Sequence, residues 1–84
     1  RTGMLFDFGR ETAIRMWMKN TRIPLDMLFV GEGGGIRYIA ANTVPYSEAL
    51  IVAPEPARYV LEINAGEAAR FGLQAGDTLL LRRR

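Results

Sequence analysis

The sequence of 84 residues contains no cysteine and no histidine. Without cysteine the chain can form no disulfide and offers no thiolate as a nucleophile or metal ligand. Without histidine it lacks the commonest general base and the commonest transition-metal ligand of proteins. Ser47 is the only serine, and with no histidine to activate it a Ser-His-Asp triad is excluded. We therefore expect no metal and no other cofactor.

Long apolar runs are also absent, so no segment is expected to span a membrane. Apolar residues nevertheless make up 49% of the chain, which is enough for a compact core and too much for a disordered segment. A chain of this length supports one small core, and we predict a single domain over residues 1–84.

The positive charge is concentrated at the C-terminal end. Eleven lysines and arginines against nine acids give a net charge of +2, and residues 82–84 are all arginine. Without these three the balance is 8 − 9 = −1. A nucleic-acid-binding domain carries a basic face with interleaved aromatics. We therefore predict a solvated basic tail at 82–84 and no nucleic-acid partner.

Most segments alternate between apolar and polar residues with the period of a β-strand. The expected strands cover residues 4–8, 13–19, 27–30, 36–41, 48–52, 58–63 and 78–82. Glycines at 31–35 predict a hairpin over 27–41, and only residues 66–71 favour a helix, ended by Gly72. This pattern predicts a small antiparallel β-sandwich or barrel of six or seven short strands, with one short α-helix near the C-terminus.

Two scarce residues lie close together. Trp17 is the only tryptophan, and Lys19 is the only lysine beside ten arginines. The alternation over 13–19 places Ile14, Met16 and Met18 on one face, and Arg15, Trp17 and Lys19 on the other. The methionines are expected in the core.

The second face has two possible interpretations. If it is open, it offers a flat aromatic ring between two cations, which suits an anionic or ring-bearing ligand. If loops cover it, Trp17 is a second core anchor and the cations pair with Asp26, Glu48 or Glu62.

The adjoining 20–26 loop carries Asn20, Thr21 and Asp26. Such residues commonly brace a loop by bonding to backbone amides. They could also converge beside the aromatic ring, so the predicted ligand-binding residues are Arg15, Trp17, Lys19, Asn20, Thr21 and Asp26. Lys19 and Asp26 are at the same time the candidates for a catalytic acid/base pair, since a desolvated lysine can act as a base. An ordinary salt bridge is the alternative for Lys19.

Four motifs resemble the family of domains of unknown function numbered 192 (DUF192). They read G-M-L-F-D-F, M-W-M-K-N-T-x-I-P-L-D-M-L-F-V, R-Y-V-L-E-I-N-A-G and G-L-Q-A-G-D, from Gly3 to Asp77. The resemblance implies a mainly β, jelly-roll-like domain and no known activity. Many bacterial members carry a secretion leader, which implies a periplasmic or secreted location, with a cytoplasmic one as the alternative. Members usually have a further G-L-M-x-R stretch before G-M-L-F, so the N-terminal part of the family domain is expected to be missing here.

The leading hypothesis is a non-enzymatic β domain of the bacterial cell envelope that binds a small ligand or a protein. It would use the face of Arg15, Trp17 and Lys19 together with the 20–26 loop. The first alternative is an enzyme that uses Lys19 and Asp26. The second is a structural or assembly module that pairs through a sheet edge.

Overall fold

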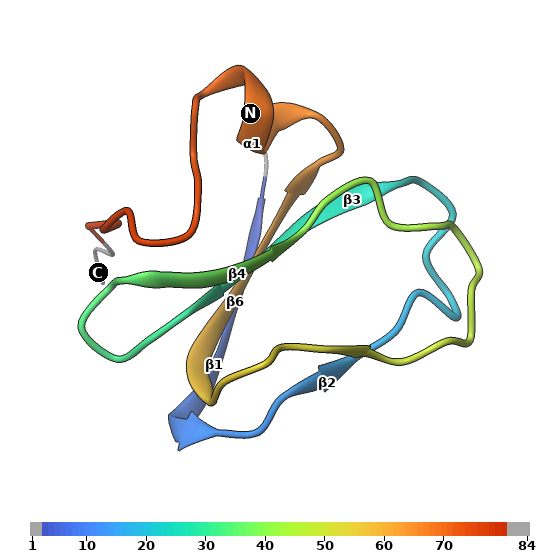
Figure 1. Ribbon diagram of the computed structural model, residues 1–84. Helices are drawn as coiled ribbons and strands as arrows, with labels where there is room; N and C mark the ends of the chain where they lie inside the picture. Colours follow the sequence, from blue (N-terminus) through green and yellow to red (C-terminus); the bar gives the residue numbers. More distant parts are fainter. Residues whose placement is uncertain (1–2, 81–84) are drawn as a thin grey trace.

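The structure is a computed structural model and describes residues 3–80 (Figure 1). Its elements are β1 (Met4–Thr12), β2 (Arg15–Met16), β3 (Leu25–Val30), β4 (Ile36–Ala40), β5 (Ile51–Val52), β6 (Ala57–Asn64) and α1 (Glu67–Arg70). Every strand pair is antiparallel, so the predicted mainly β fold with a short helix near the C-terminus is confirmed. Its jelly-roll connectivity stays a prediction, and the basic tail at 82–84 lies outside the described residues.

The strands form two sheets. One has four strands in the order β1-β6-β3-β4, and the other pairs β2 with β5. All six residues of β3 are buried, because this strand is covered on both faces. Met27 and Phe29 pack between the two sheets, whereas Leu28 and Val30 pack toward α1 and the C-terminal segment. Complete burial of each such side chain stabilises the fold by about 1.5–3 kcal/mol.

The predicted hairpin over 27–41 is confirmed as β3 and β4. The glycine turn between them has Gly34 at φ 95°, a left-handed conformation that favours glycine. The carbonyl of Gly34 accepts a hydrogen bond from the amide of Leu79 at 2.7 Å, and Gly35 pairs with Thr78 as an isolated bridge. The turn therefore also anchors the segment that follows the helix.

The predicted helix over 66–71 is confirmed as α1, and its end is a Schellman motif. Gly72 has φ 67°, and its amide donates to the carbonyl of Ala69 at 3.0 Å. The amide of Leu73 donates to the carbonyl of Ala68 at 2.8 Å. These two bonds satisfy carbonyl groups that the last turn of a helix leaves open.

Three predicted strands are shorter than the pattern indicated. The strand over 13–19 is reduced to β2, and the strand over 48–52 to β5. After β2, the amide of Met18 donates to the carbonyl of Ser47, and the amide of Thr21 donates to the carbonyl of Met18. The apolar alternation continues beyond β2 because the side chain of Met18 is still buried in the core. The backbone of this residue, however, no longer pairs with a neighbouring strand. Of the strand predicted over 78–82, the described residues show only the bridge at Thr78.

Candidate functional site

Trp17 lies on an open face of the molecule. Its side chain is 47% exposed, while Ile14 and Met18 on either side of it in the sequence are buried at 2% and 0%. The ammonium nitrogen of Lys19 lies 5.1 Å from the centroid of the Trp17 ring, which is a cation–π contact. The face that carries the tryptophan is thus open, and Trp17 is not a second core anchor.

The segment around Trp17 carries an excess of positive charge, because residues 13–23 contain three cations and no acid. Arg15, Lys19 and Arg22 are all exposed, and none of them takes part in an ion pair among residues 3–80. The pairing with Asp26, Glu48 or Glu62 that a covered face would require is therefore not formed. We call Arg15, Trp17 and Lys19 the aromatic–cation surface.

A second loop supports the segment that follows Trp17. The amide of Met18 donates to the carbonyl of Ser47 at 3.1 Å, and the amide of Tyr46 donates to the carbonyl of Thr21 at 3.0 Å. Tyr46 is 61% exposed and has φ 63°, an unusual backbone conformation for a bulky residue. Strain of this kind is concentrated at functional sites. Sequence reasoning missed Tyr46, and its only signal was its position directly after Pro45 in a loop.

Asp26 is separated from this surface by burial. Its side chain is 1% exposed, and one carboxylate oxygen accepts the amide of Asn42 at 2.9 Å. The other accepts the amides of Gly66 at 3.1 Å and Ala68 at 2.9 Å. Asp26 thus ties β3 to the loop after β4 and to the start of α1. These contacts are a bracing role, but Asp26 lies in β3 and not in the loop expected over 20–26, because its backbone pairs with β6.

The remaining loop residues divide between solvent and support. Asn20 is exposed, and Thr21 is half-buried with its carbonyl bonded to Tyr46. Of the predicted ligand-binding residues, Trp17 and Lys19 are therefore in contact and Asn20 is accessible. Asp26 is buried and cannot contact a ligand.

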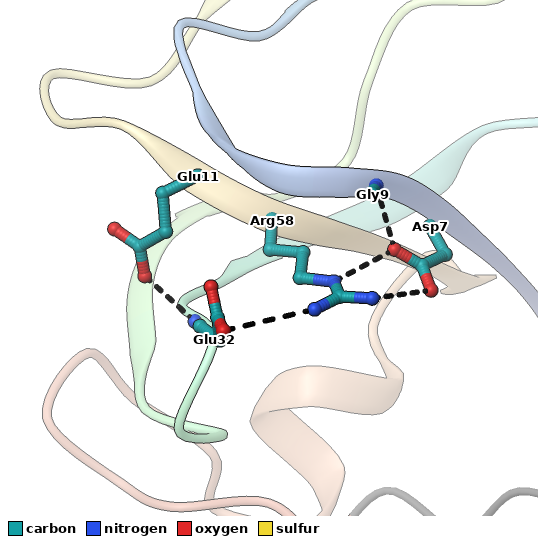
Figure 2. A network of polar contacts seen from close by, with 5 residues as sticks. All are labelled: Asp7, Gly9, Glu11, Glu32 and Arg58. Carbon is teal, nitrogen blue, oxygen red and sulfur yellow. Dashed lines mark hydrogen bonds and ion pairs between the residues drawn. The ribbon is translucent and has the colours of Figure 1, made fainter.

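A separate polar network joins β1 to β6 and to the β3–β4 hairpin (Figure 2). Arg58 holds Asp7 through two bonds of 2.9 and 3.2 Å, and its third nitrogen lies 3.7 Å from a carboxylate oxygen of Glu32. Asp7 also accepts the amide of Gly9 at 2.8 Å. Opposite charges are paired throughout, which indicates a structural network.

Glu11 extends this network from the end of β1. One of its oxygens accepts the amide of Glu32 at 2.7 Å, and the other pairs with Arg37 at 2.6 Å. The hydrogen bond from Arg37, followed by that from the Glu32 amide, lowers the pKa of Glu11 below its ordinary value. The Arg37 guanidinium also donates to the carbonyl of Pro56 at 2.7 Å. Both of its partners come from outside the hairpin, so Arg37 fixes the hairpin against β1 and β6.

These features define a small antiparallel β domain with an exposed aromatic–cation surface. The sequence profile of the family DUF192, described as an uncharacterized ACR, matches residues 1–81, and the chain belongs to this family. No protein with a curated description matches the chain. Among residues 3–80, no helix has the length and apolar character needed to cross a membrane.

Two solved structures are similar to this chain. One is a proposed transcription regulator from Sinorhizobium meliloti 1021, with 56% identity over 90% of this chain and a TM-score of 0.88. The other is a protein of unknown function from Novosphingobium aromaticivorans, with 47% identity over 90% of this chain and a TM-score of 0.86. The chain spans 59% and 54% of the lengths of these two proteins.

Proposed function

We propose that this chain is a non-enzymatic binding domain whose aromatic–cation surface holds an anionic ligand that contains a ring. The observation that carries the proposal is the exposed Trp17 ring with the Lys19 ammonium 5.1 Å from its centroid. A ring of the ligand would stack on Trp17, and its negative group would meet Lys19 or Arg15. Asn20 and Thr21 would border the ligand. Asp26 would not touch the ligand, and its hydrogen bonds would hold β3 in place.

The molecule contains a second exposed cation–π pair that provides a control. Arg70 lies 5.2 Å from the ring centroid of Phe71, but it also contacts a carboxylate oxygen of Glu67 at 3.5 Å. Its charge is therefore balanced, unlike that of Lys19. Charge available to a ligand is what distinguishes the two pairs.

The test is a titration of Trp17 fluorescence with phenylacetate and glucuronate, beside their neutral analogues phenylacetamide and glucose. We expect saturable changes with the anions and weaker changes with the neutral compounds. Lys19→Gln should weaken anion binding by about tenfold, which corresponds to about 1.4 kcal/mol. Arg70→Gln should leave it unchanged. Equal binding of anions and neutral analogues, or no binding at all, would overturn the proposal.

We also propose a location in the bacterial cell envelope. Its support is the family membership and the bacterial origin of the two similar structures. Fractionation of a bacterium that expresses the full-length gene product with a C-terminal tag would test this proposal. Recovery in the periplasmic or secreted fraction is expected, and recovery only in the cytoplasm would contradict it.

One observation favours a second candidate function, assembly through a sheet edge. β1 is one of the two outer strands of the four-stranded sheet, and among residues 3–80 it pairs only with β6. Its side chains Met4, Leu5, Phe6 and Phe8 are between 36% and 58% exposed. An exposed apolar edge strand is a template for pairing with another chain. No comparable observation favours an enzyme that uses Lys19 and Asp26, because Asp26 is buried and bonded to three amides.

A further inference from the structure

A cleft of about 550 Å³ lies between the outer edge of β4 and the residues around β5. Most of its lining residues belong to the 41–50 segment, which runs from the four-stranded sheet to the two-stranded sheet (Figure 1). Met18, Tyr38 and Ile51 belong to its apolar lining, and Asn42, Thr43 and Ser47 supply polar groups. None of the residues proposed for the aromatic–cation surface lines it, so this is a second and distinct site.

The size of the cleft fits a small molecule. Ligand pockets in proteins commonly have volumes of about 300–1,000 Å³. Two other hollows among the described residues are smaller, at about 220 and 180 Å³, and each is bordered by a carboxylate, Glu62 or Glu32. The cleft is thus distinguished from them by both volume and chemistry.

Among the described residues, the lining of the cleft carries no charge. Every member of it is apolar or neutral and polar, with no acid, lysine or arginine. A charged group placed against such a wall loses hydration without gaining a counter-charge. The lining therefore selects against ions and favours an uncharged, largely apolar ligand.

The polar groups in the wall are unequally available. The hydroxyl of Thr43 accepts the amide of Leu25 at 3.0 Å and lies 3.2 Å from the sulfur of Met18, so it is occupied in bracing β3. The hydroxyl of Ser47 accepts the amide of Ala49 at 3.1 Å. By contrast, none of the hydrogen bonds among residues 3–80 uses the side-chain amide of Asn42 or the hydroxyl of Tyr38. These two groups can orient a ligand through a carbonyl or a hydroxyl.

From this geometry we infer that the cleft binds a neutral small molecule with an apolar body and a hydrogen-bonding carbonyl or hydroxyl. The apolar body lies against Leu50, Ile51 and Val52, and the polar group bonds to Asn42 or Tyr38. The site is independent of the aromatic–cation surface, because that surface selects for negative charge and the cleft selects against it.

The test uses Nile red, a neutral and apolar dye with a carbonyl group, titrated into the whole chain. Ala49 is exposed and lines the cleft, so Ala49→Phe fills the cleft without disturbing a buried position. Ala69 is also exposed but lies on α1, and Ala69→Phe is the matched control. We expect saturable binding at one site, weakened by at least about tenfold in Ala49→Phe and unchanged in Ala69→Phe.

A second pair of variants separates the cleft from the apolar strand β1, which could also attract the dye. Leu50 lines the cleft and is 57% exposed, whereas Leu5 on β1 is 42% exposed and does not line it. Leu50→Glu should abolish binding, and Leu5→Glu should not change it. The inference is overturned if Leu5→Glu abolishes binding, if both cleft variants bind like the wild type, or if the wild type binds no dye. Trp17→Ala should leave dye binding intact, so failure of the proposed anion site would not imply failure of the cleft.

Discussion

At the scale of residues, adjacent side chains in one short segment have opposite roles. Met18 is completely buried and belongs to the cluster between the sheets, whereas Trp17 is 47% exposed. The period-two alternation predicted this division correctly. Alternation alone did not show whether the second face was open, because that depends on how residues distant in sequence fold over it.

The stability of two alanine variants tests this division. Met18→Ala removes a buried side chain and should lower the free energy of unfolding by about 2–5 kcal/mol. Trp17→Ala should lower the free energy of unfolding by less than about 1 kcal/mol, since the ring is half-exposed and belongs to neither core cluster. Urea denaturation followed by circular dichroism measures both values. A loss for Trp17→Ala as large as that for Met18→Ala would mean that the ring is structural.

Asp26 shows what sequence reasoning at a single residue could not reveal. Its position in a polar, proline-containing loop suggested either bracing or chemistry, and the amides it accepts come from Asn42, Gly66 and Ala68. Those partners lie 16, 40 and 42 residues away in the chain. Contacts over such separations are set by the sheet topology, so no local pattern predicts them.

We predict that Asp26→Ala lowers the free energy of unfolding by at least about 3 kcal/mol. The substitution leaves the amides of Asn42, Gly66 and Ala68 without their acceptor. Asp26→Asn should cost less, since one oxygen remains as an acceptor. Denaturation in urea at neutral pH measures the two losses. If Asp26→Ala were nearly as stable as the wild type, the bracing role assigned to this carboxylate would be wrong.

At the scale of elements, the glycine turn between β3 and β4 offers a sharp comparison. A Cβ atom added at Gly34 would meet the carbonyl oxygen of Leu79, and the residue has φ 95°. A Cβ at Gly33 would meet no atom within 4 Å. Gly34→Ala should therefore destabilise the fold by about 2 kcal/mol or more, through a left-handed backbone and a displaced carbonyl.

Gly33→Ala is the matched control and should change the stability by no more than about 0.5 kcal/mol. Thermal unfolding of the two variants side by side gives the comparison. Equal destabilisation of both would show that the close approach of Leu79 to the turn is not formed.

Two glutamates should respond to pH in opposite directions. Burial raises the pKa of Glu62 above its ordinary value of 4.5, so the folded state disfavours its charged form. The stability that this group contributes is complete below that ordinary value and is lost as the pH rises through the folded pKa. Glu62→Gln should therefore stabilise the protein at about pH 7, and this gain should disappear at about pH 3.5.

Glu11 behaves in the reverse way, because its bond from Arg37 lowers its pKa. Its contribution is present above the ordinary pKa and is lost as the pH falls through the folded value. Glu11→Gln should thus destabilise the protein at about pH 7 and have little effect in acid. Thermal unfolding across the pH range measures both curves. If both variants changed stability in the same direction at neutral pH, these assignments would be contradicted.

The sequence predicted the type and order of the elements better than their lengths. The hairpin and the helix cap were identified because glycines mark their ends, and Gly34 and Gly72 do adopt left-handed conformations. The strands over 13–19 and 48–52 were too long because alternation reports which side chains reach the core. It does not report which backbone groups belong to a ladder. Only two residues of each segment form the smaller sheet.

For the whole molecule, β1 is the strand through which we propose association, and a polar network holds it in place. The network fixes Asp7 and Glu11 of this strand to Arg58 and Arg37, while the apolar side chains from Met4 to Phe8 remain exposed. If this edge mediates assembly, sedimentation should show concentration-dependent association. Phe6→Lys should abolish that association, and Leu50→Lys, at another exposed apolar position, should not. A monomer at all concentrations would contradict the assembly function.

The fluorescence of Trp17 tests whether its ring lies on an open surface that attracts anions. Because Trp17 is the only tryptophan, its emission reports this site alone. We predict that iodide, an anion, quenches it more strongly than caesium, a cation, and that Lys19→Gln combined with Arg15→Gln removes the difference. Blue-shifted emission that neither quencher reaches would mean that the ring lies beneath a cover and that this surface is not open.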